Sequence, residues 1–385
     1  VSDLRQVSIA WPIPYKDEQD RQSALLTKQA QYVGHIIGHE GPGSLLSYLK
    51  NKGWVNSLSA GGGENLSDFE TFDVTATLTK SGLEKVDRVV EAIYATISMI
   101  RSRPVPKYIF NEVLQLEELG WRFSSKGSVS NYLQSLSNSL QDYPPSLCVA
   151  GPRRLALRQD DATTLLASNA ARTAFDSTAQ LDYTRKLASD FVDNLTVDNA
   201  MYTIISKSYK GDTNQKEYWY GTDYRVDAVP ISTMLQWKNP TSVDDFGITF
   251  PRKNIFIPSE NGLKLKFPPK PNVGKAPRSF EDRMAVIPPP RVIRDDGDNG
   301  RWTVYYKADD TFGQPKAFVI FELLTKEVYS SAKAAALSNM YEFCVADHLT
   351  EYAYDAGLAG LTYDVQVIPR GVRLTFGGYN DKLED

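Results

Sequence analysis

Apolar and polar residues alternate along one segment of the chain, just before a stretch of helical periodicity. The alternating segment places Phe72, Val74, Ala76 and Leu78 on one side and Asp73, Thr75, Thr77 and Thr79 on the other. This period of two predicts a strand with one buried face. The apolar residues that follow recur at helical spacing, namely Leu83, Val86, Val90, Ile93, Ile97 and Ile100. The pattern predicts an antiparallel sheet covered on one side by helices, which is the α+β class.

The same criteria predict the other elements. Further strands are expected at residues 7–13, 54–59, 200–205, 302–306, 317–324, 361–367 and 371–376. Helices are expected at 32–50, over most of 106–195, and at 330–357. A helix that ends at a glycine, a strand, a turn and a second strand follow one another twice, within 32–78 and within 341–376. Repetition of so large a unit indicates a duplicated domain, of which the second copy is incomplete.

Proline is concentrated in one segment of the chain. Eight of the 21 prolines lie between residues 258 and 290. Proline has no backbone N–H to donate and a fixed φ angle, so this segment is predicted to be an extended linker. We therefore divide the chain into a domain at 1–258, a linker at 259–287 and part of a second domain at 288–385.

Charge and cysteine content narrow the range of partners. The 385 residues include 43 basic and 47 acidic side chains, for a net charge of −4. This balance does not favour nucleic acid, and no apolar run is long enough to span a membrane. Cys148 and Cys344 fall in separate predicted domains, unlike the closely spaced cysteines of extracellular scaffolds. The sequence therefore favours a cytoplasmic protein.

Predicted strands lie beside both chain ends, so we expect a piece of a longer polypeptide.

Two segments have alternative interpretations. The run at 60–63, Ala-Gly-Gly-Gly, is expected to form a flexible hairpin turn, although small residues can also leave a strand edge open to a peptide backbone. The run at 218–222, Tyr-Trp-Tyr-Gly-Thr, is expected to pack its aromatic side chains at a domain edge.

His35 and His39 are four residues apart, which would place both on one helix face, as in zinc-binding helices. A hydrolytic zinc site also needs a third ligand and a general base. Residues 36–38 are Ile-Ile-Gly, without a glutamate, and Gly-Pro-Gly at 41–43 breaks the next turn. We therefore predict no metal site and no catalytic residue in this chain. A structural or peptide-contacting role is preferred for the two histidines.

Residues 32–58, YVGHIIGHEGPGSLLSYLKNKGWVNSL, resemble the start of the second domain in the pitrilysin family of inverted-zinc metallopeptidases, in particular its insulysin branch. Further segments that match the family, in the family's order, are 11–14, 217–222, 254–258, 351–354, 358–361 and 378–382. The resemblance implies four similar α+β domains in two halves that enclose a peptide chamber. It places this chain as domain two, the linker and the first part of domain three.

In the family, zinc and the catalytic base belong to a His-x-x-Glu-His helix of domain one, and this sequence has no such motif. The resemblance thus implies zinc in the full-length parent enzyme, no cofactor in this chain, and no peptide cleavage by the chain alone. It also implies an exosite in domain two, where the N-terminal end of a substrate adds to a sheet edge. The matching positions are His35, Gly38, His39, Glu40, Leu58, Ser59, Ala60 and Gly61. Glu40 is the expected partner of the terminal ammonium, and the methyl group of Ala60 is expected to narrow the approach of the substrate backbone.

The preferred hypothesis is the non-catalytic central part of a zinc metalloendopeptidase, which anchors short or unfolded peptides for proteolysis. The expected partners are peptide substrates and the remaining domains of the parent peptidase, with self-association left open and no nucleic acid or membrane. The alternative is a structural or binding subunit of a catalytically inactive family member. A third hypothesis, an independent metalloenzyme that uses His35 and His39, predicts stoichiometric zinc in the purified chain.

Overall fold

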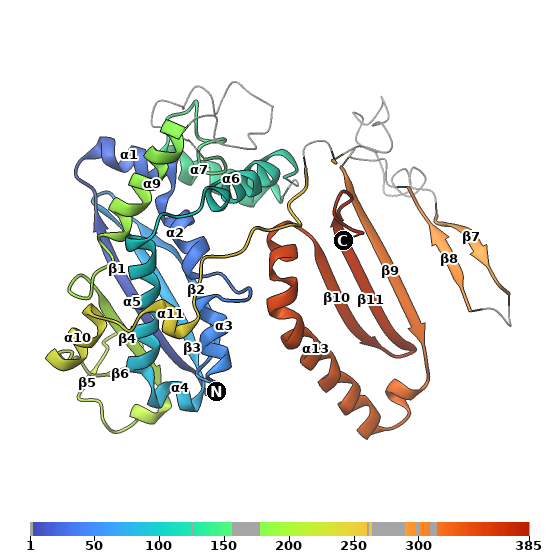
Figure 1. Cartoon of the computed structure of the whole chain (residues 1–385). Helices are drawn as coiled ribbons and strands as arrows, with labels where there is room; N and C mark the ends of the chain where they lie inside the picture. Colours follow the sequence, from blue (N-terminus) through green and yellow to red (C-terminus); the bar gives the residue numbers. More distant parts are fainter. Residues whose placement is uncertain are drawn as a thin grey trace.

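Two antiparallel sheets, each packed with helices, form the two units of the chain (Figure 1). The structure is a computed structural model that describes residues 3–124, 127–155, 178–259, 262–263, 289–297, 301–308 and 314–384. The predicted linker at 259–287 lies almost entirely outside these ranges. The α+β class predicted from the sequence is confirmed.

The first unit is built on a four-stranded sheet in the order β2-β3-β1-β4, so that β2 and β4 are its edge strands. Its strands are β1 (Arg5–Pro14), β2 (Val55–Asn65), β3 (Phe69–Leu78) and β4 (Met201–Ser206), followed by the small hairpin of β5 (Gln215–Lys216) and β6 (Asp223–Tyr224). Its helices are α1 (Glu18–Thr27), α2 (Gln29–Ile37), α3 (Leu45–Asn51), α4 (Lys80–Glu84), α5 (Val86–Ser102), α6 (Lys107–Arg122), α7 (Val129–Asp142), α9 (Thr178–Val192), α10 (Ile231–Lys238) and α11 (Val243–Phe246).

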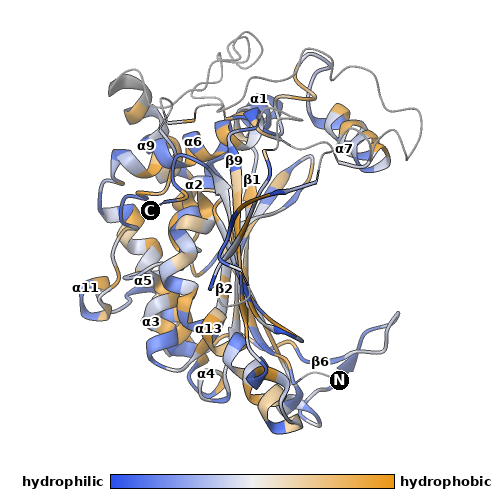
Figure 2. Ribbon diagram, turned by 90° about the vertical axis from the view of Figure 1, so that its right-hand side faces the viewer, coloured by the Kyte–Doolittle hydropathy of each residue, from blue (hydrophilic) through white to orange (hydrophobic). Residues whose placement is uncertain are grey.

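The core of the first unit lies between this sheet and its helices. Apolar residues of β1 and β3 face one another in the register Val7–Ala76, Ile9–Val74 and Trp11–Phe72, and all are buried. The opposite face of the sheet is polar, and the hydroxyl groups of Ser8 and Thr75 are hydrogen-bonded at 2.9 Å. In Figure 2 the labelled helices α3, α5 and α9 lie on the same side of the sheet. The alternation read from the sequence therefore separates a helix-covered face from a polar one.

The second unit repeats the strand arrangement of the first. It contains β9 (Lys316–Leu324), α13 (Ala332–Leu358), β10 (Thr362–Ile368) and β11 (Gly371–Tyr379), and is preceded by the hairpin of β7 (Arg291–Asp295) and β8 (Thr303–Tyr306). The sheet order β10-β11-β9 corresponds to β2-β3-β1 of the first unit. In the first unit, helices connect β1 to the edge strand β2. In the second unit, α13 connects β9 to the edge strand β10 in the same way. The predicted duplication is thus visible in the topology.

Corresponding helices in the two units also end in the same way. Gly53 and Gly360 have positive φ angles of 68° and 79°, which residues with a Cβ atom rarely adopt. After each glycine, a backbone N–H reaches back five residues along the chain, from Trp54 to Leu49 and from Leu361 to Ala356. This is the hydrogen bond of a Schellman helix end, and it directs the chain into β2 or β10.

Two sequence predictions for the first unit need correction. The helix expected at 32–50 is interrupted, because Gly38 ends α2 and the Gly-Pro-Gly run at 41–43 precedes the start of α3. The aromatic run at 218–222 does not pack at a domain edge: Tyr218, Trp219 and Tyr220 are more than 80% exposed at the tip of the β5–β6 hairpin. Glu217 supports this tip, since its carboxylate accepts hydrogen bonds from two of the turn's backbone N–H groups.

A buried ion pair fixes the segment after α7 to α6. Nε and Nη2 of Arg154 donate to the two carboxylate oxygens of Glu118 at 2.9 Å, and both side chains are almost fully buried.

The two cysteines, Cys148 and Cys344, are unpaired. None of the helices in the described ranges combines the length and apolar character that a membrane crossing requires.

Candidate functional site

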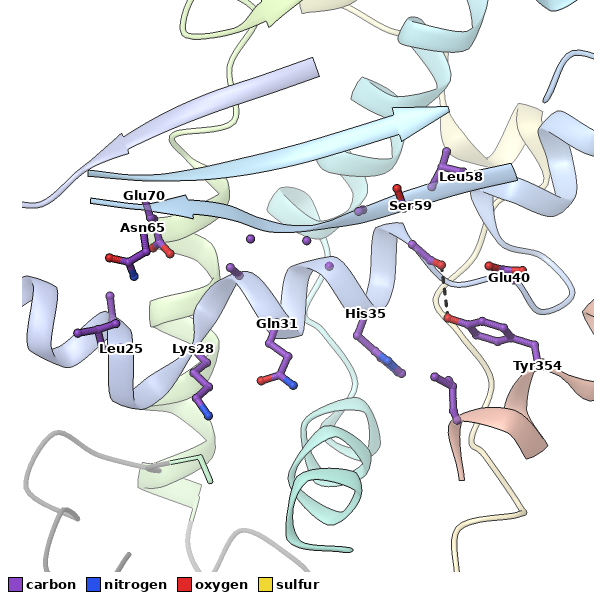
Figure 3. A pocket seen from close by; sticks show the side chains of 18 of the residues that line it. Leu25, Lys28, Gln31, His35, Glu40, Leu58, Ser59, Asn65, Glu70 and Tyr354 are labelled. Atoms are coloured by element: carbon purple, nitrogen blue, oxygen red, sulfur yellow. Dashed lines mark hydrogen bonds between the residues drawn. The ribbon is translucent and has the colours of Figure 1, made fainter. Parts of the chain in front are cut away.

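A groove of about 590 Å³ runs along the outer edge of β2. Its lining includes all the predicted exosite residues except His39, together with residues of α1, α2 and α13 (Figure 3). The further lining residues are Ala24, Leu25, Lys28, Ala30, Gln31, Gly34, Gly62, Asn65, Glu70, Tyr143, Tyr354 and Leu358. Residues that the resemblance assigned to one site therefore lie together, next to an edge strand.

β2 extends through the glycine run, so the prediction of a hairpin turn at 60–63 is wrong. Ala60, Gly61 and Gly62 pair with Val74, Asp73 and Phe72 of β3, and the chain turns only at 66–68. Glycine weakens a central strand because it has no side chain to pack against neighbours, and this loss is smaller in an edge strand. Within the described ranges, the outer side of this strand has no neighbour in the sheet, and its backbone groups can pair with an added strand.

The helix beside the groove approaches β2 at two glycines. A Cβ atom added to Gly34 would lie 3.0 Å from the carbonyl oxygen of Ala60 and from the Cα atom of Gly61. One added to Gly38 would lie 2.9 Å from the carbonyl oxygen of Gly34 and 3.2 Å from the backbone nitrogen of Ala60. A side chain at either position would press on β2. Because both residues are glycines, α2 can pack close to the strand that borders the groove.

The methyl group of Ala60 does not point along the sheet edge. Ala60 is directly opposite the buried Val74 and packs against the core cluster, so its side chain is on the helix-covered face. Side chains stand roughly perpendicular to a sheet, whereas inter-strand hydrogen bonds lie in its plane. The methyl group therefore leaves the hydrogen-bonding edge of β2 accessible, contrary to the expected narrowing.

His35 lies in the middle of the groove wall. Burial, followed by the nearby His39, lowers the pKa of His35 to about 4. The imidazole is therefore neutral at physiological pH. Its Nε2 atom is buried and has no hydrogen-bond partner among the described residues. A buried ring nitrogen without a partner is unusual, because buried polar groups are normally hydrogen-bonded.

His39 has a different role from the other predicted residues, because it is buried between the two units. Its Nδ1 accepts a hydrogen bond from the backbone N–H of Gly41 at 3.0 Å, which assigns the ring proton to Nε2. Nε2 lies 3.2 Å from Oδ1 of Asp355 in α13. Next to it, the hydroxyl of Tyr354 is 3.4 Å from the carbonyl oxygen of Gly38. His39 thus positions α13 at the groove and does not line it.

Two residues of the second unit close one end of the groove, and the sequence did not assign them to the site. Tyr354 and Leu358 of α13 line the groove, and Tyr354 lies near Glu40 (Figure 3). Glu40 is partly exposed and makes no hydrogen bond or ion pair with the described residues. Tyr354 belongs to a segment that matched the family, but its place at the groove depends on the contact between the units, which one sequence does not reveal.

The other end of the groove is formed by Leu25, Asn65 and Glu70 (Figure 3). Tyr143 also belongs to this end, because its hydroxyl donates to the carbonyl oxygen of Leu25 at 3.0 Å. Burial, with a smaller contribution from Asp20, raises the pKa of Glu70 to about 7. Sequence reasoning missed this residue, although a signal was present. Glu70 precedes Phe72 by two positions, and so extends the alternating row of β3 residues on the helix-covered face.

The described residues contain no group of three or more His, Cys, Asp or Glu side chains that could hold a metal ion. The two histidines have ring centroids 5.8 Å apart, but both nitrogens of His39 are engaged by protein groups. The site as described therefore offers a sheet edge to which a strand can be added, with the imidazole of His35 in the groove wall and the carboxylates of Glu40 and Glu70 at its two ends.

Comparisons with known proteins show the family of this chain. A family model described as "Peptidase M16 inactive domain" matches residues 1–116, and one described as "Middle or third domain of peptidase_M16" matches residues 121–385. Insulin-degrading enzyme of Homo sapiens is 31% identical over 361 residues, which cover 94% of this chain and 31% of the relative. A nardilysin-like protein of Arabidopsis thaliana is 30% identical, with 100% of this chain and 33% of the relative covered.

Among solved structures, pitrilysin matches with a TM-score of 0.67 and 19% identity, over 99% of this chain and 35% of that chain. The similarity supports the pitrilysin-type fold of both units. The chain spans about a third of the length of the curated relatives that it matches. Since the two family models together take in nearly all of its residues, the chain belongs to the peptidase M16 family.

Proposed function

We propose that this chain is a non-catalytic central part of a zinc metalloendopeptidase, and that it anchors the N-terminal end of peptide substrates on β2. The zinc site that cleaves them would belong to another part of the parent polypeptide. The human relative is named for the degradation of insulin, and we take peptides as the substrate class of this chain. The two unpaired cysteines support a cytoplasmic location.

The observation that carries the proposal is the unpaired outer edge of β2 within a groove. Added strands bind through main-chain hydrogen bonds, which give affinity for many sequences. The groove supplies an edge of this kind from Leu58 to Asn65, and Gly34 and Gly38 bring the wall of α2 close to it. Such a site would hold extended peptides with little dependence on their sequence.

Glu40 supports the choice of the N-terminal end. Its carboxylate lies at the groove end beside Tyr354 and has no ion-pair partner among the described residues. A terminal ammonium group is a charged donor, and a hydrogen bond between two charged groups is about twice as strong as a neutral one. We expect the first residue of a bound peptide at this end.

The test is binding of a peptide that carries a fluorophore at its C-terminus, measured by anisotropy. A free N-terminus should bind more tightly than an acetylated one by roughly tenfold, because acetylation removes one charge-assisted hydrogen bond. Glu40→Gln should abolish this difference. Glu84→Gln, which removes an exposed carboxylate outside the groove, is the matched control and should retain it. Equal affinity of both peptides for the unaltered chain would contradict the ammonium contact.

A different observation distinguishes this proposal from the alternative, in which the chain is a structural or binding subunit of a catalytically inactive family member. A His-x-x-Glu-His motif elsewhere in the parent polypeptide supports the peptidase, and its absence there supports the subunit.

A further inference from the structure

Glu70 occupies an unusual place in the first sheet. It is opposite Ile13 of β1 and opposite Asn65 of β2, in the same row as the buried Phe72 and Val74. Its carboxylate therefore leaves the sheet on the helix-covered face, where a core residue would be expected. It is only partly buried, because the groove opens at this point. A ligand in the groove can reach it.

The surroundings of Glu70 do not neutralise its charge. The groups that face it are Asp20 of α1 and Tyr15, which follows β1. Among the described residues, Glu70 has no hydrogen-bonding or ion-pairing partner, and the nearby Arg21 is already bound to Asp142. A half-buried carboxylate beside a second acid is stabilised by an added cation.

Lys28, the basic residue that lines the groove, is also engaged elsewhere. Its Nζ donates to the backbone carbonyl groups of Pro152 and Arg154 at 2.9 and 3.1 Å. Figure 3 shows Lys28 pointing away from β2, while Glu70 and Asn65 lie together at the end of the groove. No cation of the described residues is therefore paired with Glu70, and we take the ligand as the source of one.

The distance between the two groove ends sets the position of that cation along a peptide. From Leu58 to Asn65, β2 covers roughly 20 Å at about 3.3 Å per residue, with some length lost at the bulge between Gly62 and Asn65. An extended peptide that begins at Glu40 and follows β2 therefore comes close to Glu70 after roughly six residues. His35 of α2 lines the groove between these ends (Figure 3).

We propose that Glu70 is a second specificity determinant of the groove, which selects peptides with an arginine or lysine roughly six residues from the N-terminus. The inference rests on the peptide-anchoring function proposed above. It adds a side-chain preference to a site that otherwise recognises main chain.

The test is a lysine scan in peptides of ten residues that carry a free N-terminus, a C-terminal fluorophore and otherwise uncharged side chains. A single lysine is placed in turn at positions three to nine, and anisotropy is measured at pH 8. Affinity should peak near position six, roughly five- to tenfold above the peptide without lysine. The preference should weaken at pH 6, since Glu70 has a pKa of about 7.

Two variants identify the carboxylate responsible. Glu70→Gln should remove the peak and leave the affinity for the lysine-free peptide unchanged. Glu64→Gln removes the same charge from an exposed position of β2 that does not line the groove, and should keep the peak. If the affinity does not vary with the position of the lysine but still depends on a free N-terminus, the role of Glu70 is overturned and the anchoring function is not. Loss of the peak in both variants also overturns it, and failure of every peptide to bind overturns the anchoring function as well.

Discussion

The neutral imidazole of His35 predicts a specific loss of stability in acid. Its pKa is about 4 in the folded chain, because burial disfavours the charged ring. In the unfolded chain an exposed histidine has a pKa near 6.5. Above about pH 6.5 the ring is neutral in both states and imposes no penalty. As the pH falls below 6.5, the unfolded chain binds a proton that the folded chain excludes, and the free energy of unfolding decreases.

The magnitude follows from the two pKa values. Between pH 8 and pH 5 the loss due to His35 is about 2 kcal/mol, and it levels off below about pH 4, where the folded chain also takes up the proton. The assay is urea unfolding followed by tryptophan fluorescence at several pH values from 5 to 8. In His35→Gln this contribution is absent, so the change in unfolding free energy across the range should be smaller by about 2 kcal/mol.

His348 supplies the matched control, because it is exposed on α13. His348→Gln should follow the unaltered chain across the pH range, although titrating carboxylates affect all three proteins. The reasoning would be refuted if the unaltered chain and His35→Gln lost the same free energy between pH 8 and pH 5.

Two further predictions concern side-chain contacts between separate segments of the chain. Arg154→Met removes the guanidinium that pairs with the buried Glu118 and should lower the free energy of unfolding by about 3–5 kcal/mol in urea titrations; a loss below about 1 kcal/mol would contradict the importance of this ion pair. Asp355→Ala leaves the Nε2 proton of His39 without an acceptor and should cost about 1–3 kcal/mol, whereas Asp355→Asn retains an acceptor and should cost less; equal losses would argue against this hydrogen bond.

The sequence predicted those parts of the fold that depend on local periodicity. Alternation in β3 and the helical spacing of α5 are properties of neighbouring residues, and both elements appear in the structure close to the predicted ranges. The duplication was also visible, because each copy keeps the same order of helix end, strand and strand. These features follow from short-range patterns that burial on one face imposes.

The site was predicted only in part, for physical reasons. Local propensity favours a turn at 60–63, but pairing with β3 overrides it and lengthens β2. The separate roles of the two histidines could not be read from their spacing, since His39 turns towards Asp355 in the other unit. Glu70 was overlooked because an acid is not expected in a buried row, yet its register with Phe72 was already present in the sequence.

The closing of the groove by Tyr354 and Leu358 has a thermodynamic consequence. A ligand that contacts α13 as well as β2 binds better when the two units are docked than when they are apart. By linkage, the same ligand must stabilise the docked arrangement by an equal free energy. A ligand of this kind would therefore strengthen the docking that the contacts of Asp355 and Tyr354 maintain, and separation of the units would weaken its binding.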